Sequence, residues 1–374
     1  MDEPATICSA RNKAQGRLDA AQWAGRRVLV TGHTGFKGSW LVHWLHLMGA
    51  EVFGLALAPA ANSHFERSQT ARYLVQDSRC DIRDSQAVQS TVRDAQPEFV
   101  FHLAAQALVR PSYDDPLETL ATNAMGTAHV LQGCRELPNL RAVVVVTTDK
   151  CYQNNGQPWP YRETDRLGGH DPYSTSKACA ELVTACFAQS FFRGGPRVAT
   201  ARAGNVIGGG DVCRDRLLPD AFRAWDLGQP LTVRHPHAVR PWQHVLDALG
   251  AYLVLAQALS EPSLQVSEAY NFGPAERGEW PVWRVIEAAE AAWGHALPRR
   301  SLTEDPQRPE ASALRLDASM ALRDLNWRNQ LDTAAAIDWT VEWEKAWRQG
   351  VAAAAITAEQ IDRIMAIKEP THGA

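Results

Sequence analysis

The feature that most limits the fold of this chain is a glycine-rich turn between a short strand and a helix. Residues 27–30 (Arg-Val-Leu-Val) are typical of a buried strand, and Gly32, Gly35 and Gly38 follow it. The apolar stretch from Ser39 to about Met48 is expected to form the helix. A strand, a glycine turn and a helix in this order are typical of the start of an α/β sheet.

Strands and helices continue to alternate along the first two thirds of the chain. Further strands are predicted at residues 51–57, 99–104, 142–147 and 198–203, and helices at 116–134 and 173–192. The segment 142–147 holds four consecutive valines, which is typical of a parallel strand buried on both faces. The alternation implies right-handed βαβ crossovers and predicts an α/β fold with a doubly wound parallel (Rossmann) sheet.

The pattern changes after about Gly208, where proline, tryptophan and arginine become frequent. Helices are expected at 246–259, 283–293 and 332–347, and in the last of these Trp339, Trp343 and Trp347 recur every four residues, as in a packing face. We therefore expect a smaller mixed α/β C-terminal substrate domain with this tryptophan face in its core. The predicted division is a Rossmann domain at 25–208, with a return near 242–273, and a substrate domain at 209–241 and 274–350.

Composition excludes several classes of protein. The net charge of −4 argues against a nucleic-acid binder. Seven cysteines without a C-x-x-C pair disfavour a disulfide framework and a zinc site, so we expect no metal and a cytoplasmic location. No apolar run approaches the ~18 residues of a spanning helix, and the start of the chain lacks the apolar region of a signal peptide, so no membrane partner is expected.

The glycine turn has a chemical interpretation. Glycines at this spacing let the backbone approach a pyrophosphate, and the helix N-terminus supplies amide donors, so a dinucleotide site is predicted. Its usual companion is a carboxylate at the end of the second strand. Here residues 54–57 read Gly-Leu-Ala-Leu, with neither an acid nor an adjacent arginine. NAD is the predicted cofactor, and NADP is not excluded.

Two further motifs carry reactive groups. Tyr173 and Lys177 lie one turn apart on a predicted helix, where an ammonium can lower the pKa of a phenol and make it a usable base. The alternative is an exposed helix pair with a solvated lysine. The Val-rich strand ends in Thr147, Thr148, Asp149 and Lys150, at the sheet edge where α/β proteins place their ligands. These four residues also fit a capped loop with a surface ion pair.

Together these motifs resemble the extended short-chain dehydrogenases/reductases. The resemblance covers residues 25–350 and includes the segments 81–84 (Asp-Ile-Arg-Asp), 102–105 (His-Leu-Ala-Ala), Asn123 and 271–274 (Asn-Phe-Gly-Pro). Within that family, segments 32–40, 148–152 and 202–211 resemble the CDP-glucose 4,6-dehydratases. Segment 240–247 resembles the part of these enzymes that contacts the nucleotide-sugar diphosphate.

The resemblance implies a nucleotide-sugar 4,6-dehydratase that makes CDP-4-keto-6-deoxyglucose by internal hydride transfer, from C4 to the cofactor and back to C6, with loss of water. It assigns the catalytic roles to Thr148, Asp149, Lys150, Tyr173 and Lys177. Tyr173 would be the base for the 4-hydroxyl, Asp149 the acid for the C6 hydroxyl and Lys150 the C5 base. Lysine can serve as that base only when neutral, which burial would favour.

The resemblance also assigns binding residues. The cofactor would contact Gly32, Thr34, Gly35, Phe36, Lys37, Gly38, Asp81, Ile82, Leu103, Ala104, Ala105, Asn123, Tyr173 and Lys177. The sugar nucleotide would contact Gln106, Thr148, Arg202, Asn205 and Arg240. Arg202, Asn205 and Arg240 fit structural roles equally well. His102 is expected to orient its loop rather than to take part in catalysis.

Two other functions fit parts of the pattern. A nucleotide-sugar 4-epimerase of the same family needs Tyr173, Lys177 and Thr148 but no acid–base pair for C6. A non-catalytic protein that senses the cofactor could use the same fold. As in relatives, the apolar helices at 116–134 and 173–192 are expected to pair across a two-fold axis, giving a homodimer or a dimer of dimers.

Overall fold

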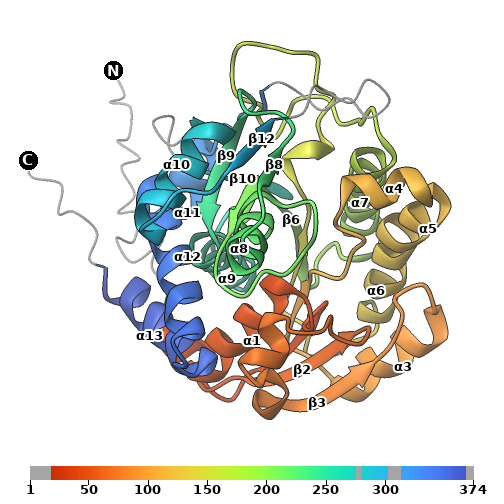
Figure 1. Cartoon of the computed structure of the whole chain (residues 1–374). Coiled ribbons are helices and arrows are strands. Elements are labelled where there is room, and N and C mark those ends of the chain that lie inside the picture. Colours follow the sequence, from red (N-terminus) through yellow and green to blue (C-terminus); the bar gives the residue numbers. More distant parts are fainter. Residues whose placement is uncertain (1–17, 275–278, 302–312, 368–374) are drawn as a thin grey trace, which may run out of the picture.

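A parallel sheet of seven strands forms the centre of the protein (Figure 1). The computed structural model describes residues 18–274, 279–301 and 313–367. The strand order is β10-β6-β5-β4-β1-β2-β3, and every neighbouring pair is parallel. The strands are β1 (Arg27–Thr31), β2 (Glu51–Ala56), β3 (Leu74–Arg79), β4 (Phe99–His102), β5 (Ala142–Val146), β6 (Arg197–Ala203) and β10 (Ala269–Phe272). The predicted doubly wound sheet is confirmed.

Both faces of this sheet are covered by helices. On β5, Val144 and Val146 belong to one apolar cluster, whereas Val143 and Val145 belong to another. The first cluster includes α1 (Phe36–Leu47), α9 (Val245–Ser260) and α13 (Ala353–Ala366). The second includes α3 (Ser85–Ala95) and α6 (Gly126–Cys134), with side chains of α7 (Pro172–Phe191) packed against it. Burial on two faces explains why the valine run has no polar alternation.

The helix predicted at 116–134 is interrupted by a π turn. It consists of α5 (Pro116–Leu120), η3 (Ala121–Met125) and α6, and it follows the short helix α4 (Val109–Asp114). Asn123 lies in the π turn, where its amide donates to Gln106 O at 2.9 Å and to Ser176 Oγ at 2.8 Å. The turn thus holds a polar side chain inside an otherwise apolar helix layer.

The remaining elements form a smaller part with mixed strand directions. Strand β9 (Val239–His244) pairs in parallel with β7 (Asn205–Ile207) and antiparallel with β11 (Glu279–Pro281), and β8 (Leu231–Val233) pairs with β12 (Arg299–Ser301). The helices are α8 (Leu217–Leu227), α10 (Val282–Trp293), α11 (Ser319–Leu325) and α12 (Thr333–Arg348). This confirms the smaller mixed part, although β7 pairs here and lies within the predicted Rossmann range.

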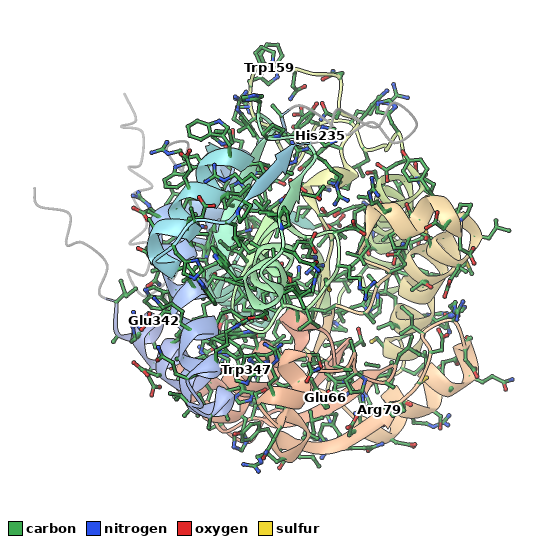
Figure 2. All side chains as sticks on the ribbon, in the orientation of Figure 1. Glu66, Arg79, Trp159, His235, Glu342 and Trp347 are labelled. Carbon is green, nitrogen blue, oxygen red and sulfur yellow. The ribbon has the colours of Figure 1, made fainter. Side chains whose placement is uncertain are left out.

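The tryptophan face of α12 packs, but not where we predicted. Trp343 is fully buried in the cluster that contains α1, α9 and α13, whereas Ile337 and Val341 on α12 belong to the core of the smaller part. Trp347, labelled in Figure 2, is covered by the Arg67 guanidinium at 3.6 Å from its ring centroid. Helix α12 therefore joins the two cores, because it is apolar on both sides.

The short elements outside these layers are α2 (His64–Arg67) and the turns η1 (Ala20–Gln22), η2 (Thr70–Tyr73) and η4 (Asp149–Cys151). Among the helices of the described ranges, none combines the length and apolar character needed to cross a membrane.

Candidate active site

The site lies where the strand order changes direction, between β1 and β4. These strands are neighbours in the sheet, and the connections from their carboxyl ends lead to opposite sides of it. In open α/β sheets a crevice forms at this point and takes the ligand. The glycine turn follows β1 and residues 103–106 follow β4, so both predicted segments meet at this edge.

The glycine turn is tightly packed against its neighbours. Gly32 has a φ of +73°, and a Cβ there would come within 2.7 Å of Ala104 N. A Cβ at Gly38 would lie 2.2 Å from Gly32 O, whereas one at Gly35 would meet only Gly32 O, at 3.3 Å. Helix α1 begins directly after Gly35, at Phe36. The turn thus leaves room above Gly35 at a helix N-terminus, an arrangement that fits the pyrophosphate of a dinucleotide.

An arginine lies where the usual ribose-binding acid is missing. Arg79, at the end of β3 (Figure 2), donates to Leu57 O at 3.1 Å and to Asp77 at 2.6 Å. Thr34 Oγ1 donates to the same carbonyl at 3.0 Å. Arg79 was missed because β3 has no clear apolar pattern and was not predicted. The ion pair with Asp77 partly neutralises the positive charge of the Arg79 guanidinium.

The other predicted cofactor residues lie in two groups. Leu103, Ala104 and Ala105 follow β4 beside the glycine turn, and Ala104 N donates to Thr31 Oγ1 at 3.1 Å. Asp81 follows β3 and accepts a hydrogen bond from Arg83 N at 2.9 Å. Ile82 next to it fills the space above Gly126.

Three side chains near this edge form hydrogen bonds within the protein: Asn123, Gln106 and His102. Asn123 Oδ1 accepts from Gln106 N at 2.9 Å, and the Gln106 side-chain amide binds Leu108 in its own loop and Thr119 on α5. His102 bridges Thr31 and Thr127 through its two ring nitrogens, and burial lowers its pKa to about 3. His102 is therefore held between Thr31 at the end of β1 and Thr127 on α6, and its role in orienting the loop stays a prediction.

The catalytic candidates meet at the carboxyl end of β5. Thr148 Oγ1 donates to Asp149 Oδ1 at 2.9 Å, and Lys177 Nζ donates to Val146 O at 3.3 Å. Tyr173 is hydrogen-bonded to Thr148. The exposed fractions of Tyr173 and Lys177 are 8% and 7%, so the exposed helix pair is excluded. Four residues predicted from two separate motifs thus form one buried group.

The pKa of Tyr173 differs from the prediction. Burial raises the pKa of this phenol to about 12, while the hydrogen bond with Thr148 and the charge of Arg216 oppose the rise. We expected Lys177 to lower it, but the Lys177 ammonium is directed to Val146 O. Burial also lowers the pKa of Lys177 to about 8. Desolvation therefore dominates the energetics of this pair.

Asp149 has the environment of a proton donor. Burial raises the pKa of its carboxyl, although Lys150, Thr148 and Arg240 act against the rise. Its Oδ2 is buried without a hydrogen-bond partner in the structure. Lys150, the predicted C5 base, is partly buried. An unpaired buried oxygen beside Tyr173 fits a reacting hydroxyl in the site.

Lys37 and Arg216 lie near the buried side chains at the end of β5. Arg216 was not identified from the sequence, nor was Tyr252, which Lys37 contacts. Lys37 Nζ contacts Tyr252 Oη at 3.4 Å, and burial, with Lys177 and Arg216 nearby, lowers its pKa to about 7. Arg216 precedes α8 and pairs with Asp211 at 2.8 Å. Tyr252 was missed because it lies in an apolar helix, and Arg216 because arginine is common in this chain.

The predicted substrate residues separate into two kinds. Arg202 donates to Glu181 at 2.7 Å and to Tyr152 Oη at 2.8 Å, and it is only 4% exposed. The structure therefore supports the structural role for Arg202 rather than the substrate role. Arg240 is buried on β9 near Asp149, and Asn205 begins β7, paired with Trp242. These two remain candidates.

In the described ranges no group of acidic, histidine and cysteine side chains is arranged to hold a metal.

We predict that Gly38→Ala weakens NAD binding at least about tenfold, because its Cβ would collide with Gly32 O and open the turn. Titration calorimetry with NAD measures the effect. Gly195→Ala is the control, since its Cβ would meet no atom closer than 3.8 Å. Equal affinity of the Gly38→Ala and parent proteins would contradict the assignment of this turn to the cofactor.

Comparison with known proteins agrees with this geometry. Residues 28–273 match the NAD dependent epimerase/dehydratase family. A CDP-glucose 4,6-dehydratase of Salmonella typhimurium is 44% identical over 89% of this chain and 94% of its own length. A dTDP-glucose 4,6-dehydratase of Xanthomonas campestris is 28% identical over 89% of this chain and 98% of its own length.

Solved structures share the fold. The UDP-glucose 4-epimerase of Thermotoga maritima has a TM-score of 0.74 at 22% identity, covering 87% of this chain and 99% of the epimerase. The dTDP-glucose 4,6-dehydratase of Bacillus anthracis, in complex with NAD, has a TM-score of 0.72 at 21% identity, covering 86% and 97%. The predicted family and its cofactor, NAD, are thereby confirmed. The chain belongs to the NAD dependent epimerase/dehydratase family.

Proposed function

We propose that the chain is a CDP-glucose 4,6-dehydratase that forms CDP-4-keto-6-deoxyglucose with loss of water. The observation that carries the proposal is the buried Asp149 carboxyl, which shares Thr148 with Tyr173 and keeps one oxygen unpaired. A 4-epimerase needs the tyrosine but has no use for such an acid. The similarity to the Salmonella dehydratase supports the same choice and supplies the CDP-glucose substrate.

The first half of the reaction would take place at Tyr173. Its phenol removes the proton of the 4-hydroxyl, and Thr148 donates a hydrogen bond to the same sugar oxygen. NAD held at the glycine turn would supply the hydride acceptor and donor for this cycle, and its positive charge near Tyr173 would favour the phenolate. The buried ammonium of Lys177 stabilises the phenolate from the same helix.

The second half would be an elimination across C5 and C6. The 4-ketone acidifies the C5 proton, which Lys150 removes, and Asp149 protonates the departing C6 hydroxyl so that it leaves as water. The raised pKa of Asp149 keeps this proton available. Lys150 then returns its proton to C5 and regains its starting form. The proton that Tyr173 took from the 4-hydroxyl replaces the one that Asp149 gave to the departing water, so Tyr173 and Asp149 also return to their starting forms.

The diphosphate of the substrate requires cations, and Arg216 and Arg240 lie near Tyr173 and Asp149. Their guanidinium groups suit the bidentate contacts that phosphates make. Asn205 is the candidate for a sugar hydroxyl. The cytoplasmic location expected from the cysteine content remains a prediction.

The test of this function is incubation with CDP-, dTDP-, UDP- and GDP-glucose in parallel. We expect turnover of CDP-glucose at the highest kcat/KM, with a 4-keto product that absorbs in alkali. A galactose isomer without this absorbance would indicate the 4-epimerase. Absence of turnover with all four would favour the non-catalytic protein.

Lys150→Met should abolish exchange of the C5 proton with solvent deuterium, lowering its rate at least about a hundredfold, while NAD stays bound. Mass spectrometry of the product measures the exchange, and titration with NAD is the control. Exchange at the parent rate would place the C5 base elsewhere.

The protein is proposed to form a homodimer through α5, η3 and α7. Large apolar side chains on these elements are exposed: Leu117, Met125, Leu182 and Phe191. Leu117 is 77% and Leu182 60% exposed, which is unusual for a face made of neighbouring helices. A second copy presenting the same face would bury these side chains around a two-fold axis, and a further pairing of dimers would use another surface.

Leu182→Asp should convert the dimer into a monomer at micromolar concentration, because it places a charge in an apolar interface. Light scattering after gel filtration measures the mass. Leu227→Asp is the matched control, since Leu227 is 65% exposed on α8, outside this face. A dimer that persists in Leu182→Asp would exclude this interface.

A further inference from the structure

Three successive residues at the end of β5 each contact α7, at positions one helical turn apart. Val146 O accepts from Lys177 Nζ at 3.3 Å, Thr147 Oγ1 donates to Glu181 Oε1, and Thr148 is hydrogen-bonded to Tyr173. Glu181 is therefore the third member of a row whose other two members are the proposed catalytic pair. The proposed reaction gives it no role.

The carboxylate of Glu181 is fixed on all sides. Its Oε2 accepts from Thr200 Oγ1 and from Arg202 Nη2, both at 2.7 Å, while its Oε1 is held by Thr147. The residue is 3% exposed. A buried carboxylate with a charged partner and two hydroxyl donors is held in one position.

Arg202 extends this arrangement to the loop that carries Lys150. Its Nη1 donates to Tyr152 Oη at 2.8 Å, and that hydroxyl donates to Asn271 Oδ1 at 2.6 Å. Tyr152 follows η4, two residues after Lys150. Glu181 and Arg202 therefore connect the helix of Tyr173 with the loop of Asp149 and Lys150.

The charges are not balanced within this group. Glu181 is one anion between two cations, Arg202 and Lys177, and a lysine and a glutamate one turn apart on a helix are neighbours. The charged groups that act on Lys177 are Glu181 of α7 and Cys151 of η4, and Lys177 in turn acts on Lys37 of α1 and His102 of β4. Tyr173 lies one turn before Lys177 on α7. Glu181 is the carboxylate among them.

We propose that Glu181 is a positioning residue, whose carboxylate, fixed one helical turn after Lys177, is the anionic neighbour of the Lys177 ammonium and also pairs with Arg202. Because the Glu181 carboxylate also pairs with Arg202, it neutralises the Lys177 ammonium only in part. The remaining positive charge of Lys177 stabilises the Tyr173 phenolate. This inference rests on the proposed function only in taking Tyr173 and Lys177 as the reacting pair.

The test measures Lys177 directly. The chain has six lysines, Lys13, Lys37, Lys150, Lys177, Lys345 and Lys368, so protein labelled with 13C at lysine Cε gives few NMR signals. The signal that is lost in Lys177→Met assigns Lys177. Its titration is followed in the parent, Glu181→Gln, Arg202→Met and Thr200→Val proteins.

The two charge-removing variants should move the pKa of Lys177 in opposite directions. Glu181→Gln removes the anion and should lower it by about one unit, whereas Arg202→Met removes the competing cation and should raise it by a similar amount. Thr200→Val keeps both charges and should change it by less than about 0.3 unit. An unchanged value in Glu181→Gln overturns the proposal, and so does a rise in both variants, since local unfolding would expose Lys177 and raise its pKa in each.

Kinetics provides a second measurement. The active ammonium of Lys177 is lost as the pH rises through its pKa, so the alkaline limb of kcat for CDP-glucose should move to lower pH in Glu181→Gln, by the same ~1 unit, with KM nearly unchanged. A parent protein that titrates as expected but does not turn over CDP-glucose would refute the proposed function and leave the NMR test of Glu181 intact.

Discussion

The seating of α7 on the carboxyl end of β5 is the interaction on which the site depends. The valines at 143–146 of β5 are buried on both faces of the sheet, and the neighbouring strands β4 and β6 fix the direction of β5. The strand becomes polar where it leaves the sheet, and the hydroxyls and carboxyl of residues 147–149 meet one face of α7. Apolar packing thus places a polar group that would not assemble by itself.

Burial also sets the chemistry of that group. Desolvation disfavours every charged form, so it raises the pKa values of Asp149 and Tyr173 and lowers those of Lys177 and Lys37. The two lysines are brought toward neutral pH, to about 8 and about 7. The raised pKa of Asp149 suits a proton donor, whereas the lowered pKa of Lys177 sets the pH above which its ammonium is lost. Desolvation is the cause of both kinds of pKa shift.

The smaller part of the chain contributes to this site through single side chains. Arg240 comes from β9 and Arg216 from the residue before α8, and both elements follow the first six strands in the sequence. Helix α12 fixes this part against the sheet, because Trp343 is buried with α1 and α13 while Val341 is buried with α10. Packing between the two cores therefore determines where the proposed diphosphate contacts lie.

Periodicity was sufficient for the elements with a single strong pattern. The Arg27–Thr31 strand, the Ala142–Val146 strand and the Pro172–Phe191 helix appear within one or two residues of their predicted limits. The exposed edge strand β3 and the π turn at Asn123 were not predictable in this way. In β3 most side chains are exposed, so it lacks an apolar pattern, and the π turn depends on hydrogen bonds to residues distant in the chain.

By itself the sequence determined the alternation of strands and helices, the glycine turn and the spacing of Tyr173 and Lys177 by one helical turn, because each depends on residues near one another in the chain. The tertiary structure alone decided that Arg202 pairs with Glu181, that Arg79 at the end of β3 contacts Leu57 after β2, and that Tyr173 has a raised pKa. Contacts between distant segments and the removal of water fix these properties. Neither can be read from local spacing.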